Sequence, residues 1–174
     1  QNRIETYLFS MLCLILAGIS LNIIMLMVLS DLGIALTMSR IVHFFVVLSL
    51  TGLFLHFTWL TGRVQRHWWV VYLGYALGAV APFTLGDSYF TGLHTYDWGA
   101  FPRAGFFFDL MCVFWFAGLF VVLLILSKSS RAISDPGERA SRRYIWYGFV
   151  ALMVLSLCNI PNTHGFGIYP LSSL

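Results

Sequence analysis

The chain has 174 residues, of which 59% are hydrophobic and 10% are charged. A soluble domain carries about 25% charged residues, so a fully water-exposed surface is excluded and an integral membrane protein is predicted. The net charge of +3 is spread over the ends of apolar runs, which argues against a nucleic-acid partner.

Five apolar runs each approach the length of about 20 residues that a helix needs to cross a bilayer. They predict an all-α, polytopic membrane bundle of about five transmembrane helices in a single domain. The first run has no small-residue cleavage site, so we interpret it as a membrane helix and not as a signal peptide. The expected spans are Tyr7–Ser30, Ile41–Leu60, Trp68–Leu85, Phe106–Leu126 and Tyr144–Ile160.

The charges of the connections predict an orientation. Arg63 and Arg66 lie in the second connection, and the fourth, Lys128–Tyr144, has more basic than acidic residues. The segment Gly86–Gly105 has two acidic residues and one arginine. Because basic connections stay in the cytoplasm, we expect the N-terminus inside and the C-terminus outside.

The start of the fifth helix has a clear signal. Asp135 can cap the helix, Pro136 suits its first position, and Glu138 follows three residues after the cap. The helix would then carry basic residues into the membrane interface, where they can pair with anionic lipid headgroups. These residues are Arg139, Arg142 and Arg143.

Histidines and cysteines are the residue types that could bind a metal ion or a haem. His43 and His56 are 13 residues apart on one expected helix, so they point about 140° apart and cannot share a metal ion. No metal site and no cofactor is predicted, although contact with a haem or a pigment is left open. Cys13, Cys112 and Cys158 lie in apolar runs and are expected to pack as small hydrophobic residues.

The outer segment Gly86–Gly105 is long and rich in glycine and aromatic residues. Long connections are uncommon without a function, so the segment is a candidate ligand or partner surface. The alternative is a lid that only covers the bundle. Asp109 joins the candidates as the only carboxylate near the body of a span. The candidates are Tyr89, His94, Tyr96, Asp97, Trp98, Arg103 and Asp109.

Gly74 and Gly78 form a GxxxG pair, which allows close helix packing within the chain or between two copies. No nucleophile motif, zinc motif, phosphate loop or carboxylate pair is present in the sequence. We therefore expect that the protein is not an enzyme.

Four segments resemble a known family. They are SRIVHFFVVLSLTGLFLHFTWLTGR (Ser39–Arg63), TYDWGAFPRAGFFFDL (Thr95–Leu110), DPGERASRRYIWYG (Asp135–Gly148) and NIPNTHGFGIYPLSSL (Asn159–Leu174). In this order they resemble the N-terminal seven-helix membrane input domain of bacterial sensor histidine kinases. The resemblance implies a location in the bacterial cytoplasmic (inner) membrane. It matches the five spans to the second to sixth helices of that domain, so the output helix has no counterpart.

Two functions remain open at this point. One is a sensory input module, active in signal transduction, that detects a small or lipophilic ligand by a change in helix packing. The other is an accessory or structural subunit of a larger membrane complex that keeps this fold without a signalling output. Under both hypotheses the expected partners are lipids, together with other membrane subunits or a second copy of the chain.

Overall fold

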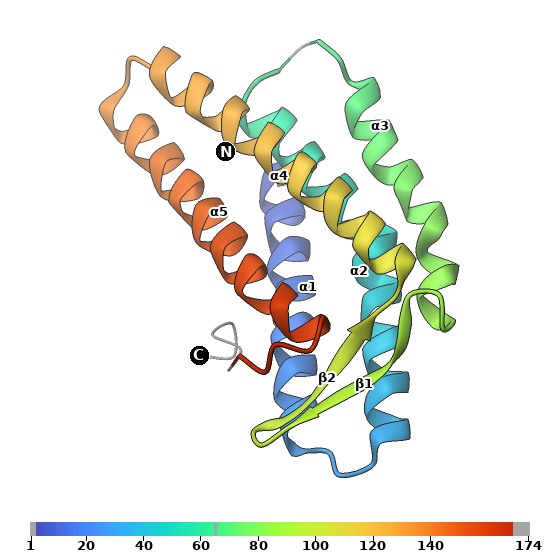
Figure 1. Cartoon of the computed structure of the whole chain (residues 1–174). Coiled ribbons are helices and arrows are strands. Elements are labelled where there is room, and N and C mark those ends of the chain that lie inside the picture. The colour runs from blue at the N-terminus through green and yellow to red at the C-terminus, as the bar shows by residue number, and fades with distance from the viewer. Residues whose placement is uncertain (1–2, 65, 169–174) are drawn as a thin grey trace.

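The computed structural model describes residues 3–64 and 66–168, and 78% of the structure is helical. Residues 169–174, the end of the fourth family-like segment, lie outside the described residues. Figure 1 shows long helices with a β-hairpin across one end. In chain order the elements are α1 (Arg3–Val28), α2 (Leu32–Thr61), α3 (Trp69–Ala76), the 3-10 helix η1 (Leu77–Leu85), β1 (Phe90–Tyr96), β2 (Gly99–Ala104), α4 (Phe106–Ala132) and α5 (Pro136–Thr163).

Four helices, α1, α2, α4 and α5, are long and apolar enough to cross a membrane. The second begins at Leu32, well before the expected Ile41, because Asp31 caps it. The carboxylate of Asp31 accepts hydrogen bonds from the backbone N–H groups of Gly33 and Ile34 at 2.9 and 3.0 Å. The cap expected at Asp135 is confirmed, since its carboxylate accepts from the N–H of Glu138 at 2.7 Å.

The expected third span, Trp68–Leu85, is not one continuous α-helix. It is an α-helix of 8 residues followed by a 3-10 helix of 9 residues, and the apolar segment Trp69–Leu85 is shorter than the four long helices. Pro82 explains the change of winding, because its ring would clash with the carbonyl group four residues earlier in an α-helix. Within residues 3–64 and 66–168 there are therefore four span-length helices and one shorter, tighter segment.

Glycines bring this segment against α2. A Cβ atom added at Gly74 would lie 2.7 Å from Cδ1 of Leu55. One added at Gly78 would overlap the backbone carbonyl of Leu48. The expected GxxxG pair thus lies at a contact within the chain, where the absence of side chains lets two helical backbones approach closely.

The outer segment contains a β-hairpin, so the all-α prediction is wrong for this part of the chain. The strands β1 and β2 pair antiparallel, with Tyr96 opposite Gly99 across a two-residue turn at Asp97 and Trp98. Gly99 has φ of 141°, a conformation that favours glycine. Ala100 and Phe101 of β2 are buried, so one face of the hairpin packs on the bundle.

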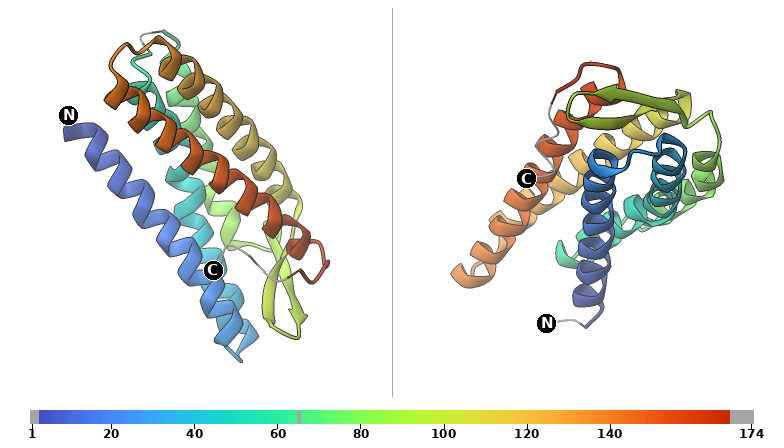
Figure 2. Two further views of the ribbon diagram at one scale, coloured as in Figure 1. Left: turned by 90° about the vertical axis from the view of Figure 1, so that its left-hand side faces the viewer. Right: turned by 90° about the horizontal axis from the view of Figure 1, so that it is seen from below.

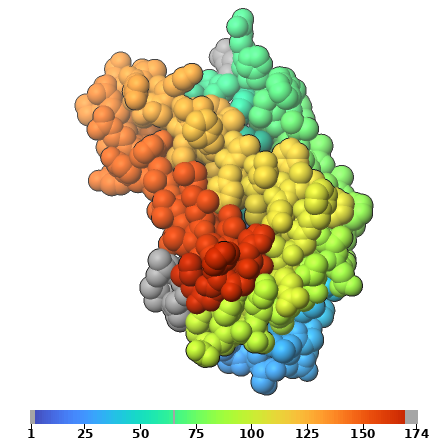
Figure 3. All heavy atoms as spheres, in the orientation of Figure 1, coloured from blue at the N-terminus to red at the C-terminus, as the bar shows by residue number. Residues whose placement is uncertain are grey.

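The core lies where α2 meets α1, α4 and α5. Phe54 of α2 contacts both Trp115 of α4 and Phe149 of α5, with ring centroids 4.9 and 5.0 Å apart. The first helix packs on α2, whereas α5 packs on α4. The view from below in Figure 2 shows α1 and α5 as two separate arms of the bundle. The C-terminal end of α5 is seated against the hairpin in Figure 3.

Candidate functional site

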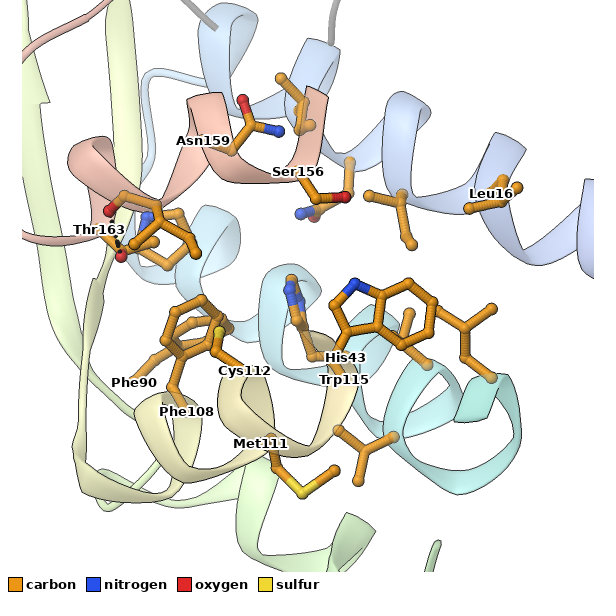
Figure 4. Close-up of a pocket in the computed structure, with 18 of the residues that line it drawn as sticks. Leu16, His43, Phe90, Phe108, Met111, Cys112, Trp115, Ser156, Asn159 and Thr163 are labelled. Carbon is orange, nitrogen blue, oxygen red and sulfur yellow. Dashed lines mark hydrogen bonds between the residues drawn. The ribbon is translucent and has the colours of Figure 1, made fainter. Parts of the chain in front are cut away.

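A cavity of about 260 Å³ lies between α1, α2, α4 and α5 near the hairpin end of the bundle (Figure 4). Aliphatic side chains of α1 and α5, including Leu16 and Leu155, form two of its walls. Phe90 of the hairpin and Phe108 and Met111 of α4 form another. The cavity is therefore an apolar space that four membrane-length helices and the hairpin share.

Aromatic rings pack tightly at the hairpin end of the cavity. Tyr89 and Phe90 are 3% and 0% exposed. Their ring centroids lie 5.9 and 4.7 Å from that of His43, and Phe108 lies 5.4 Å from Phe90. Burial is the main cause that raises the pKa of Tyr89. Its phenol therefore stays neutral and contributes a wall to the cavity.

Polar side chains from several helices reach this space. His43 comes from α2, Trp115 from α4 and Ser156 from α5, and all three point into the cavity in Figure 4. Asn159 lies one turn beyond Ser156 and also lines it. Polar groups of this kind, few and convergent in an apolar pocket, are typical of sites for small molecules.

The sequence indicated His43 only as a possible metal ligand, and it did not predict a role for Trp115 or Ser156. Among residues 3–64 and 66–168, no group of three or more histidine, cysteine or acidic residues is placed to hold a metal ion. His56 is directed elsewhere, with its Nδ1 3.1 Å from the hydroxyl of Tyr75. A polar residue at a cavity-facing position within an apolar run is the signal that could have found this site.

The expected outer surface is divided in the structure. Tyr89 lines the cavity, and Asp97 and Arg103 are exposed on the hairpin. The hydroxyl of Tyr96 donates to the backbone carbonyl of Asn162 at 2.8 Å, which fastens the hairpin to the end of α5.

Two more aromatic candidates lie beside the chain that leaves α5. The ring of Trp98 stacks on that of Tyr96 at 4.8 Å, and its Nε1 donates to the carbonyl of Gly167 at 3.4 Å. The ring of His94 lies against Gly165. These contacts make the hairpin a cover for the bundle, which was the alternative left open from the sequence.

Two polar side-chain contacts hold the hairpin end. Arg40 of α2 pairs with Asp87 and donates to the backbone carbonyl of Phe90 at 2.6 Å. Oδ1 of Asp109 on α4 lies 3.3 Å from Nε2 of His164, so these two side chains bring α4 next to the end of α5. The two pairs fix the hairpin and α5 relative to the cavity.

The opposite end of the bundle has a second polar cluster. Glu138 of α5 pairs with Arg142 at 2.9 Å and with Arg63, in the turn after α2, at 3.1 Å. Arg142 also donates to the hydroxyl of Ser129 on α4. Its side chain is only 7% exposed and contacts protein groups, while the pairing of this arginine with lipid headgroups stays a prediction.

The other two arginines of the expected headgroup site differ from Arg142. Arg139 donates to the backbone carbonyl of Ile133 at 2.6 Å through Nη2, which ties the start of α5 to the loop before it. Arg143 is exposed. Of the three arginines, Arg143 is exposed and Arg139 is half-buried, so these two are the ones that lipid headgroups can reach.

The chain was also compared with known proteins. No protein-family model, curated protein or solved structure matches it, so its function must be inferred from the site and its geometry.

Proposed function

We propose that this chain is a non-catalytic membrane module that binds a small lipophilic ligand inside its helix bundle and acts as a sensory input. The cavity between α1, α2, α4 and α5 is the observation that carries the proposal. An apolar cavity with a few convergent polar groups is the usual form of a ligand site. Among the described residues, the groups that line the cavity can form hydrogen bonds to a ligand, and no nucleophile there is hydrogen-bonded to a base.

The size of the cavity limits the ligand. Small-molecule sites usually measure about 300–1,000 Å³, so a space of about 260 Å³ suits one or two fused rings or the head of a longer lipid. Because α1 packs on α2 and α5 packs on α4, we place the entrance between α1 and α5. A ligand would then arrive from the bilayer and not from water.

Ligand binding at this position can alter helix packing. The walls come from four long helices, and the hairpin closes one end through Phe90. A ligand shifts an equilibrium only if it binds one of two arrangements more tightly. We infer that occupancy favours an arrangement in which α1 and α5 are drawn toward the shared ligand, and that this movement is the signal.

We further propose the orientation in a bacterial cytoplasmic membrane. The basic cluster around Arg63 and Arg142 would face the cytoplasm and the hairpin would face outward. The segment Trp69–Leu85 would be the fifth crossing. Its 8 α-helical and 9 3-10 residues extend for about 30 Å, which matches the hydrocarbon thickness because a 3-10 helix rises more per residue.

A second function, an accessory subunit of a larger membrane complex, is favoured by the exposure of α5. Only 6% of its most apolar window is buried within the chain. Such a face suits either lipid or a neighbouring subunit. The mass of the complex purified in mild detergent separates the two functions, since a stoichiometric set of other subunits supports the accessory role.

The experiment that tests the ligand site is calorimetric titration of naphthalene into the chain in lipid nanodiscs, with empty nanodiscs subtracted. Ser156→Phe places a ring in the cavity and should abolish the heat of binding. Leu157→Phe adds the same ring on the adjacent, 46% exposed position of α5 and should leave binding intact. No saturable binding to the unmodified chain would refute the proposal.

A further inference from the structure

The protonation of His43 follows from its one backbone contact. Its Nδ1 lies 2.8 Å from the carbonyl oxygen of Ser39. A carbonyl only accepts hydrogen bonds, so Nδ1 must carry the proton. A doubly protonated ring would place a charge among aromatic groups, with no ion pair to His43 among the described residues, and this is costly. The neutral ring therefore leaves Nε2 as an unprotonated hydrogen-bond acceptor.

The orientation of the ring is fixed by its neighbours. Besides the bond to Ser39, the imidazole packs edge-on against Phe90 with 4.7 Å between ring centroids. Tyr89 and Phe108 lie 5.9 and 6.4 Å away by the same measure. Figure 4 shows the ring pointing from α2 into the cavity. A ligand in the cavity therefore meets an acceptor whose direction is set before binding, which reduces the entropic cost of the bond.

Trp115 adds a donor on the same side of the cavity. Its indole nitrogen faces the space between α4 and α5 in Figure 4, across from Ser156. An indole Nε1–H only donates. Within the part of the chain that the structure describes, neither this nitrogen nor Nε2 of His43 has a hydrogen-bond partner. His43 thus offers an acceptor and Trp115 a donor, with the hydroxyl of Ser156 across from them, in a cavity whose walls are otherwise mostly apolar.

We propose that the ligand is a lipophilic molecule that carries a hydroxyl group on a ring, such as a phenol or a hydroquinone, and that His43 recognises the hydroxyl. The O–H donates to Nε2 of His43, and an oxygen of the ligand accepts from Nε1–H of Trp115. A hydrocarbon lacks both bonds. An ether or a quinone lacks the donor that His43 requires, so it leaves a buried acceptor unpaired. This inference rests on the function proposed above.

The test compares 2-naphthol, 2-methoxynaphthalene and naphthalene by the same titration in nanodiscs. The three share one apolar body, and only 2-naphthol has a hydroxyl. One net hydrogen bond corresponds to about 2- to 10-fold in affinity. We expect 2-naphthol to bind tighter than 2-methoxynaphthalene by this factor. His43→Phe should remove the preference and still bind naphthalene. His56→Phe, a histidine on the same helix outside the cavity, should keep the preference.

The outcomes separate this inference from the proposed function. Equal binding of all three compounds to the unmodified chain overturns the hydroxyl inference and leaves the ligand site standing. A preference that persists in His43→Phe overturns the role of His43. No binding of any compound overturns both. The comparison on the unmodified chain decides the first point even if a variant fails to fold.

Discussion

Arg142 and Glu138 lie one turn apart on α5, with 2.9 Å between Nη2 and Oε1, and the same carboxylate oxygen accepts from Arg63, in the turn after α2, at 3.1 Å. The arginine side chain is 7% exposed and the glutamate side chain is 36% exposed. One carboxylate therefore neutralises a buried guanidinium and joins α5 to the turn after α2. A buried charge without its partner is costly, so this cluster should be important for stability.

Glu138→Gln tests the cluster. The amide keeps a hydrogen-bond acceptor but loses the charge, and we expect a loss of about 1–3 kcal/mol, because hydrogen bonds to charged groups are the stronger ones. The measurement is the thermal unfolding midpoint in detergent. Glu5→Gln on α1, for which the described residues give no ion pair, serves as the control. Equal midpoints for the two variants would show that the cluster contributes nothing.

Replacement of Gly78 tests the close contact between η1 and α2. A side chain there would overlap the carbonyl of Leu48, a backbone atom that cannot move aside easily. We expect Gly78→Leu to cost about 1–3 kcal/mol or more, as overpacking does, and to lower the unfolding midpoint. Gly148→Leu is the matched control, because a Cβ at Gly148 meets no atom within 4 Å. A similar midpoint in both variants would contradict the contact.

The clamp at Arg40 should hold the hairpin in place. The guanidinium pairs with Asp87 and donates to the carbonyl of Phe90, so Arg40→Met releases both. A charge-assisted bond contributes about 1.5–3 kcal/mol, which corresponds to at least about 10-fold faster amide hydrogen exchange in β1 and β2. Arg103→Met removes an exposed arginine of the hairpin as a control. If the exchange rates stay unchanged in Arg40→Met, the clamp does not order the hairpin.

Tyr96 gives a dependence on pH. Burial raises the pKa of Tyr96 above its ordinary value of 10.0. Below pH 10 the tyrosine is neutral in both states and its stabilising bond to Asn162 is fully present. As pH rises past 10, the unfolded state ionises first, so stability falls until the pKa of the folded state is passed.

Tyr96→Phe should therefore be less stable than the unmodified chain by about 1 kcal/mol at neutral pH, and the gap should narrow above about pH 10. Unfolding midpoints of both proteins across this range measure the gap. Tyr144→Phe, at an exposed position of α5, is the control. A constant gap at all pH values would mean that the pKa of Tyr96 is not raised in the folded state, and no gap at neutral pH would mean that the hydrogen bond contributes nothing.

Local signals in the sequence explain how much of the fold could be predicted. The start of α5 at Pro136 followed from side-chain chemistry within four residues of Asp135, and the structure has it there. The equivalent cap at Asp31 was missed because the span was placed by apolar run length alone. The hairpin was missed because an alternating pattern is short in β1 and is broken at Gly92, where the pairing is irregular.

The cavity could not be predicted, for a different reason. It depends on how far α1 stands from α5, which no local pattern encodes. His43, Trp115 and Ser156 come from three helices, and nothing in their spacing along the chain indicates that they share one space. Sequence reasoning finds pairs on one helix, such as His43 and His56, far more readily than sets formed by packing.

The orientation is tested by cysteine labelling in intact cells. In a chain whose three native cysteines are replaced by alanine, Ser141→Cys and Thr95→Cys introduce exposed thiols at opposite ends of the bundle. Because the basic cluster should stay in the cytoplasm, an impermeant maleimide should label position 95 and not position 141 until the cells are opened. Labelling of position 141 and not of position 95 in intact cells would show that the chain has the opposite orientation. Labelling of both positions from outside would mean that α4, which lies between them in the chain, does not cross the bilayer.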